Sequence, residues 1–204
     1  MRRVILPGFL IMLLSIVLMA GCAGTRSVME WQDEGYSGTL GNILVIAAVD
    51  DNARRRSIED AYVAEFAANS VNATPSYTLI PDASALSRET VDAAIVGQNL
   101  DAVLVTRLAG VEEVEEYQPP VSFTHYSSYH QYYAQAMTYS NPGYYRKYKV
   151  LMLETNLYDT ASQKLIWSMQ SESIDASAPQ KVVDGQIGLT MKRMVARGLV
   201  DSGQ

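Results

Sequence analysis

The chain contains few of the residues from which most reactive sites are built. One cysteine and two histidines occur among its 204 residues, so an internal disulfide is excluded and the common zinc ligands are scarce. The sequence also lacks a Gly-x-Ser-x-Gly motif and a glycine-rich phosphate-binding loop, which are typical of many hydrolases and nucleotide-binding proteins. We therefore expect a protein that is not an enzyme and that requires neither a cofactor nor a metal ion.

Long apolar runs and an excess of positive charge are also missing. The apolar stretch at residues 9–20 is interrupted only by Ser15, and it is shorter than the ~20 residues that a membrane-spanning helix needs. The 16 basic side chains are outnumbered by 22 acidic ones, which gives a net charge of −6. This balance argues against nucleic acid as the main partner.

The single cysteine follows a segment with the features of a secretion signal. Arg2 and Arg3 precede the apolar stretch, and the small residues Ala20 and Gly21 precede Cys22. Residues 19–22 resemble the bacterial lipoprotein signal, or lipobox. A simple transmembrane anchor is the alternative, but the short apolar stretch disfavours it.

The lipobox resemblance implies a location and a modification. Residues 1–21 are expected to be a signal peptide that is removed, and Cys22 is expected to carry a diacylglycerol and an acylated amino group. Ala23, rather than Asp, follows the cysteine, which implies sorting to the outer membrane with the domain facing the periplasm. Because each buried methylene contributes about 0.8 kcal/mol, several acyl chains hold a protein firmly on a bilayer.

The remaining sequence predicts a tether and one folded domain. Residues 22–41 are rich in Gly, Ser and Thr and lack a clear period, so we expect a lipidated tether. Residues 42–49 and 101–105 are apolar runs typical of buried parallel strands, and a weaker strand is expected near 76–80. Helices are predicted after the capping residues at 50–52 and after Ser87.

The second half of the domain has a different pattern. Alternating apolar residues at 151–158 and 165–170 flank a polar turn and predict an antiparallel hairpin, and a final helix is expected over 180–199. The sequence thus predicts an α/β (α+β) fold. We expect a mixed sheet of about five strands, in the order β-α-β-α-β followed by the hairpin and the C-terminal helix, in a single domain over residues 42–204.

A tyrosine-rich insertion is predicted at about residues 117–148. Eight of the 13 tyrosines lie between positions 126 and 148, and no Asp or Glu occurs from Tyr117 to Leu153. Tyrosine provides broad, rigid contact area with a polar tip, so it is frequent at interfaces. We hypothesise that partner binding involves Tyr126, Tyr129, Tyr132, Tyr133, Tyr139, Tyr144 and Tyr145. Two alternatives are a low-complexity loop without a dedicated partner and a contact with glycan or lipid.

Other charged clusters have both structural and functional interpretations. Asp50 and Asp51 could bind a cation, although helix capping is favoured. The arginines at 54–56 could bind phosphate, although a solvated, salt-bridged helix face is favoured. The glutamates at 112–116 could bind calcium, although a charged strand edge is favoured. His125 and His130 lack the spacing and the neighbouring ligands of a zinc site.

The lipobox, the strand–helix order and the hairpin at residues 157–167 together resemble a group of envelope lipoproteins. These share a TolB-N-terminal-like α/β domain and include the curli-secretion lipoproteins, the Pel-export lipoprotein and lipoprotein activators of penicillin-binding proteins. The resemblance implies a non-enzymatic scaffold or accessory in envelope biogenesis, secretion or cell-wall regulation. Its partners would be the membrane through Cys22 and an envelope protein or a second copy, without nucleic acid. A glycan or small-ligand binding module and a pore-forming oligomer are the alternatives.

Overall fold

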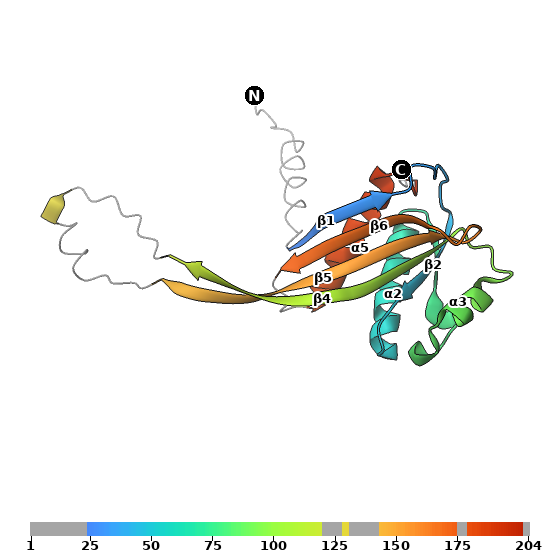
Figure 1. The fold of residues 1–204 in the computed structure, drawn as a ribbon, viewed down its shortest axis with the longest axis horizontal. Helices are drawn as coiled ribbons and strands as arrows, with labels where there is room; N and C mark the ends of the chain where they lie inside the picture. The colour runs from blue at the N-terminus through green and yellow to red at the C-terminus, as the bar shows by residue number, and fades with distance from the viewer. Residues whose placement is uncertain (1–23, 120–127, 131–142, 175–178, 202–204) are drawn as a thin grey trace, which may run out of the picture.

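The computed structural model describes residues 24–119, 128–130, 143–174 and 179–201. It has an α+β fold built on one mixed six-stranded sheet (Figure 1). Short 3-10 turns occur at Ser76–Thr78 and Ala83–Ala85. The main elements are β1 (Thr25–Gln32), β2 (Asn42–Ala47), α2 (Asn52–Ala68), β3 (Asn72–Pro75), α3 (Arg88–Ile95), β4 (Ala102–Gln118), β5 (Tyr144–Asp159), β6 (Leu165–Ile174) and α5 (Pro179–Ala196).

The sheet combines parallel and antiparallel pairs. Its strand order is β1-β6-β5-β4-β2-β3. β2 runs parallel to both β3 and β4, whereas β4, β5, β6 and β1 pair in antiparallel fashion. The predicted fold class is therefore confirmed, with a hairpin and a C-terminal helix after the β-α-β-α-β portion, and with six strands rather than about five.

The additional strand is β1, and it lies within the segment that was expected to be a tether. Residues 25–32 pair with β6 from Thr25 opposite Ser173 to Gln32 opposite Trp167. A register shift between Ser27 and Met29 breaks the two-residue alternation that identifies a strand in sequence. The described domain therefore begins before residue 42, and Tyr36 also packs against its core.

The larger core lies between the sheet and two helices. Leu104, Leu157 and Trp167 occupy neighbouring positions across β4, β5 and β6, and all three are fully buried. Aromatic and methionine side chains of α2 and α5 cover them. On the opposite face, a smaller cluster joins β2 and β4 to α3 through Ile46, Val103 and Val91 among others.

A buried ion pair fixes the start of α2 to the following segment. Arg55 and Glu59 lie one helical turn apart with Nε and Oε1 3.0 Å from each other, and neither side chain is exposed. Ser76 Oγ accepts a hydrogen bond from Arg55 and donates one to Glu59, each at 2.6 Å. Arg55 also donates to the carbonyl of Ile80.

Two predictions are corrected by this network. The arginines at 54–56 do not all form a solvated face, because Arg55 is buried against Glu59. The strand expected near 76–80 is also wrong, because these residues turn around the ion pair instead of extending the sheet. The strand in this region is β3, which ends at Pro75.

The two longest strands form a projection beyond the rest of the sheet. β4 and β5 pair continuously, apart from one bulge, from Ala102 opposite Asp159 to Gln118 opposite Tyr144. Pairing of β6 with β5 ends at Val150, and pairing of β2 with β4 ends at Thr106. Residues 113–118 and 144–149 therefore form a two-stranded ribbon, which we call the arm and which extends away from the body in Figure 1. Part of the predicted insertion at 117–148 is thus regular strand.

Candidate interaction arm and sheet groove

Complementary charges on its two strands hold the arm in register. The β4 strand supplies glutamates and the β5 strand supplies basic residues at the opposing positions. Lys149 Nζ lies 3.3 Å from the carboxylate of Glu113, and Lys147 forms an ion pair with Glu115 on the same face. Cross-strand pairs of opposite charge stabilise a ribbon modestly, by roughly 0.2–1 kcal/mol each. Among the glutamates at 112–116, Glu113 and Glu115 therefore have a structural role in strand pairing.

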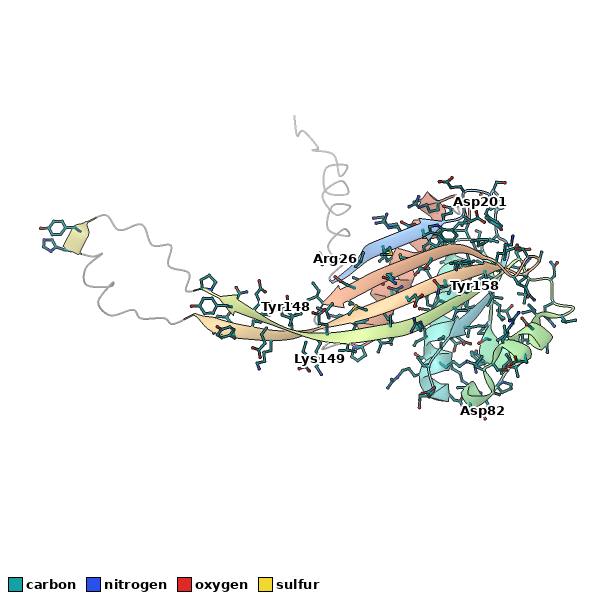
Figure 2. All side chains as sticks on the ribbon, in the orientation of Figure 1. Arg26, Asp82, Tyr148, Lys149, Tyr158 and Asp201 are labelled. Carbon is teal, nitrogen blue, oxygen red and sulfur yellow. The ribbon has the colours of Figure 1, made fainter. Side chains whose placement is uncertain are left out.

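Aromatic side chains occupy the outer end of the arm. The rings of Tyr117 and Tyr145 lie opposite each other with centroids 5.2 Å apart. Tyr144 and Tyr145 are 64% and 67% exposed, and Tyr117 is 50% exposed. Figure 2 shows Tyr148 and Lys149 on the same projection, away from the body of the domain. The described tip is thus an exposed aromatic surface on a charged ribbon.

The structure describes only some of the predicted site residues. Tyr144 and Tyr145 lie together on the arm. Tyr129 is exposed, and the centroid of its ring lies 3.9 Å from that of the His130 ring. Tyr117 joins this surface although the site prediction omitted it, because its cross-strand position is visible only once the β4–β5 register is known. The predicted positions that lie outside the described residues are Cys22, Tyr126, Tyr132, Tyr133 and Tyr139, together with His125.

The arm also presents strand edges. Within the described residues, the β4 edge that pairs with β2 has no partner strand beyond Thr106. The β5 edge that pairs with β6 has none before Val150. Such edges expose backbone N–H and C=O groups that another strand can pair with. The alternating charged side chains restrict which strand fits.

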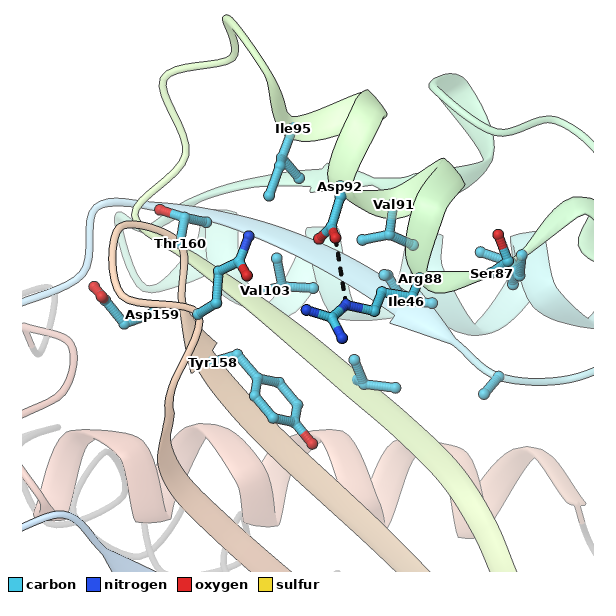
Figure 3. A pocket seen from close by; sticks show the side chains of 14 residues that line it. Ile46, Ser87, Arg88, Val91, Asp92, Ile95, Val103, Tyr158, Asp159 and Thr160 are labelled. Atoms are coloured by element: carbon cyan, nitrogen blue, oxygen red, sulfur yellow. Dashed lines mark ion pairs between the residues drawn. The ribbon is translucent and has the colours of Figure 1, made fainter.

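Apart from the arm, the body of the domain has a groove between α3 and the sheet (Figure 3). Its volume is about 650 Å³. Apolar residues such as Val91, Ile95 and Val103 line its walls, and the Arg88–Asp92 ion pair of α3, at 3.5 Å, projects into it. Tyr158 and the turn that follows β5 close one end.

Local hydrogen bonds fix the conformation of the chain at both margins of this groove. The Ser87 side chain accepts a hydrogen bond from the Thr90 N–H, and the Thr90 hydroxyl accepts one from the Ser87 N–H, so α3 begins with a capping box. At the other end, Asp159 accepts hydrogen bonds from the N–H and hydroxyl of Ser162. The groove can hold an apolar group, but no described side chain in it forms a nucleophile–base pair.

The remaining predictions concern ions and membranes. Asp51 caps α2, since its Oδ1 accepts a hydrogen bond from the Arg54 N–H at 2.7 Å, which confirms the structural interpretation for that residue. Among the described residues, no group of three or more His, Cys, Asp or Glu side chains is arranged to bind a metal. In the same residues, every helix is too short or too polar to cross a bilayer.

Comparison with known proteins gives only weak similarities. No protein-family model and no curated protein matches the chain. A PelC dodecamer from Paraburkholderia phytofirmans aligns with a TM-score of 0.44 and 9% identity over 87% of this chain and 98% of that one. Lipoprotein GNA1162 from Neisseria meningitidis aligns with a TM-score of 0.39 and 12% identity, over 76% of this chain and 99% of that one. A PDZ domain protein from Parabacteroides distasonis aligns with a TM-score of 0.41 and 9% identity, over 90% of this chain and 38% of that one. These scores are too low to support an inference about function.

Proposed function

We propose that this protein is a non-enzymatic, lipid-anchored component of the bacterial outer membrane whose domain faces the periplasm. It acts as a scaffold or accessory in envelope biogenesis, secretion or cell-wall regulation. Acylated Cys22 holds it on the membrane, and the arm contacts a protein partner or a second copy of the chain.

The arm is the observation that supports this proposal. An isolated two-stranded ribbon is marginally stable in water, yet this one carries exposed tyrosines at its outer end instead of a purely polar surface. Tyrosine rings provide contact area at a low cost in side-chain entropy. The adjacent open strand edges add backbone groups that can pair with a partner. Together they favour protein binding over catalysis.

In-cell cross-linking tests the arm as the contact surface. A photo-cross-linking amino acid at position 145 should capture a discrete product in the native host, and the same amino acid at position 96 should not. Val96 is 77% exposed directly after α3, which packs against the body of the sheet and not against the arm, so it serves as the matched control. Equal capture at both positions, or none at position 145, would contradict the proposal.

The membrane anchor has its own test. Replacing Cys22→Ala should release the protein from the membrane fraction, because the acyl chains supply the binding energy. Mass spectrometry of the wild-type amino terminus should show a cleaved and acylated cysteine. An intact, unmodified terminus, or full membrane retention of the variant, would refute the anchor.

The exposed aromatic rings also favour a second candidate, glycan binding. Tyr144 and Tyr145 present their rings to solvent, and aromatic faces are suited to stacking on sugar rings. In that case the wild-type protein should sediment with purified peptidoglycan, and a Tyr144→Ser/Tyr145→Ser variant should not. Sedimentation that is equal for both would leave protein binding as the function of these rings.

A further inference from the structure

A second cavity, which we call the trough, lies between the first halves of α2 and α5. It is on the sheet face opposite the α3 groove and has a volume of about 300 Å³. Its floor includes Ala47, at the end of β2, and Thr106 and Leu108 of β4. Ala47 and Thr106 are the last parallel pair between these strands. In open α/β sheets, ligands bind beyond the carboxyl ends of the parallel strands.

The walls of the trough are almost entirely apolar. Ile58 comes from α2, Val182 and Val183 from α5, and Leu151 and Leu153 from β5. These side chains make the trough suited to a hydrocarbon chain, because a ligand among them is removed from water on several sides.

Polar groups at the inner end of the trough already have partners. The Tyr62 hydroxyl lies 3.4 Å from Thr190 Oγ1. Gln186 Nε2 donates to Thr155 Oγ1 at 2.9 Å, and Thr155 Oγ1 lies 3.2 Å from Thr106 Oγ1. A ligand therefore needs no polar group at its buried end, since these protein groups satisfy one another.

The charged lining of the trough has one sign. Arg54 and Arg107 line it, and no Asp or Glu does so among the described residues. Arg107 is paired with Glu154 at 2.5 Å. The Arg54 side chain is exposed and forms no ion pair within the described part of the chain. In a protein of net charge −6, this arginine gives the trough an edge that complements an anion.

We propose that the trough binds a single-chain anionic amphiphile, with its alkyl chain between α2 and α5 and its oxyanion at Arg54. Fatty acids and lysophosphatidic acids share this chemistry. Binding at this site is separate from the proposed role of the arm, which lies beyond the body of the sheet.

Fluorescence displacement with the full chain in phosphatidylcholine nanodiscs tests the proposal. A dansyl-tagged undecanoate should bind saturably, and dodecanoate or dodecyl phosphate should displace it. Dodecanol should compete about fivefold less well, and dodecylammonium less well again, because an exposed ion pair contributes up to about 1 kcal/mol. The relative strength of the carboxylate and the phosphate then identifies the preferred head group.

Variants identify the site. Arg54→Gln should weaken displacement by the two anions about fivefold and leave dodecanol unchanged, whereas Arg88→Gln should have no effect. Arg88 is the matched control, since it is an exposed arginine at the start of α3 beside the other groove. Ile58→Trp and Val183→Trp should each fill the trough and abolish saturable binding, with folding verified by circular dichroism.

The opposite results would overturn the assignment. Binding that is not saturable, or that matches empty nanodiscs, would indicate partition into the bilayer. Equal binding by folded Ile58→Trp or Val183→Trp would place the ligand elsewhere, and an unchanged response of Arg54→Gln to both anions would remove the role of that arginine.

Discussion

At the residue scale, Glu59 is the most connected side chain in the described structure of α2. Its two carboxylate oxygens accept hydrogen bonds from the Ala47 and Tyr77 N–H groups, as well as from Arg55 and Ser76. The residue therefore joins the end of β2, the first turns of α2 and the segment after β3. Because the groups of Ala47, Arg55 and Ser76 are buried, they depend on Glu59 for a hydrogen-bond acceptor.

Replacing Glu59→Gln should strongly destabilise the fold. The amide keeps the shape of the side chain but leaves the buried Arg55 without a counter-charge, and breaking a buried pair in this way costs about 3–5 kcal/mol. Urea unfolding followed by circular dichroism measures the loss. Arg56→Gln is the control, because Arg56 is exposed and loses only a surface cation–π contact with Tyr77, so it should change the free energy of unfolding by no more than about 1 kcal/mol. Equal effects of the two variants would contradict this account.

Glu30 has a comparable role on the edge strand. It accepts hydrogen bonds from Trp167 Nε1 at 3.0 Å and Arg197 Nε at 2.9 Å, and Arg193 lies nearby. Partial burial by itself raises the pKa of Glu30. The hydrogen bonds from Arg197 and Trp167 and the two positive charges outweigh this effect and hold the pKa below its ordinary value of 4.5.

This pKa shift gives a pH dependence of stability. A carboxylate whose pKa is lower in the folded state stabilises the fold above its unfolded pKa, and the contribution is lost as the pH falls through the folded value. Wild type should therefore exceed Glu30→Gln in unfolding free energy at neutral pH, and the difference should shrink on acidification below 4.5. Urea titrations across this range test it, with the exposed Glu34→Gln as control. A difference that is independent of pH would show that the charge of Glu30 is not responsible.

At the element scale, the arm depends on pairs formed between its two strands. Lys147→Glu places a negative charge opposite Glu115. We expect this repulsion to lower the free energy of opening the arm by roughly 0.2–1 kcal/mol. Hydrogen exchange of backbone amides in residues 113–118 should become faster, while exchange in β2 stays unchanged. The double variant Glu115→Lys/Lys147→Glu reverses the pair and should restore protection. Failure of this restoration would show that the ion pair does not set the arm's stability.

The dependence of some elements on contacts with distant residues explains which elements could be predicted from the sequence. The buried β2 was recognisable from its continuous apolar run, and α2 and α3 from the capping residues Asp51 and Ser87. These signals are local. The outer parts of β4 and β5 lack apolar alternation, because opposite charges and tyrosines from distant positions stabilise them. Their pairing, and hence the position of Tyr117, could not be predicted from either strand alone.

Other differences between the predicted and the observed elements arise from tertiary contacts. β1 is an edge strand with a bulge, and it is ordered by Glu30 and by pairing with β6. The segment after β3 has strand-like composition but turns around Arg55. The trough is formed by α2, α5 and the sheet together, so no single sequence pattern could indicate it. The aromatic part of the candidate site was predictable from composition, whereas its presentation on a ribbon was not.

At the scale of the whole molecule, the arm is separate from both hydrophobic cores. No residue of 113–118 or 144–149 belongs to either buried cluster. Glu112 and Val150, at the base of the arm, lie opposite each other in the β4–β5 register. An Asn-Gly turn can therefore join these two positions directly, since two-residue loops of this type suit antiparallel hairpins.

Replacing residues 113–149 with Asn-Gly should consequently separate folding from partner binding. We expect the unfolding free energy to change by less than about 1 kcal/mol, because the excised strands contribute no side chain to either core. Co-purification of the cross-linked partner from envelopes should be lost, while membrane attachment through Cys22 should remain. A shortened protein that cannot fold would show that the arm supports the body. A stable one that still captures the same partner would move the interaction surface to another part of the molecule.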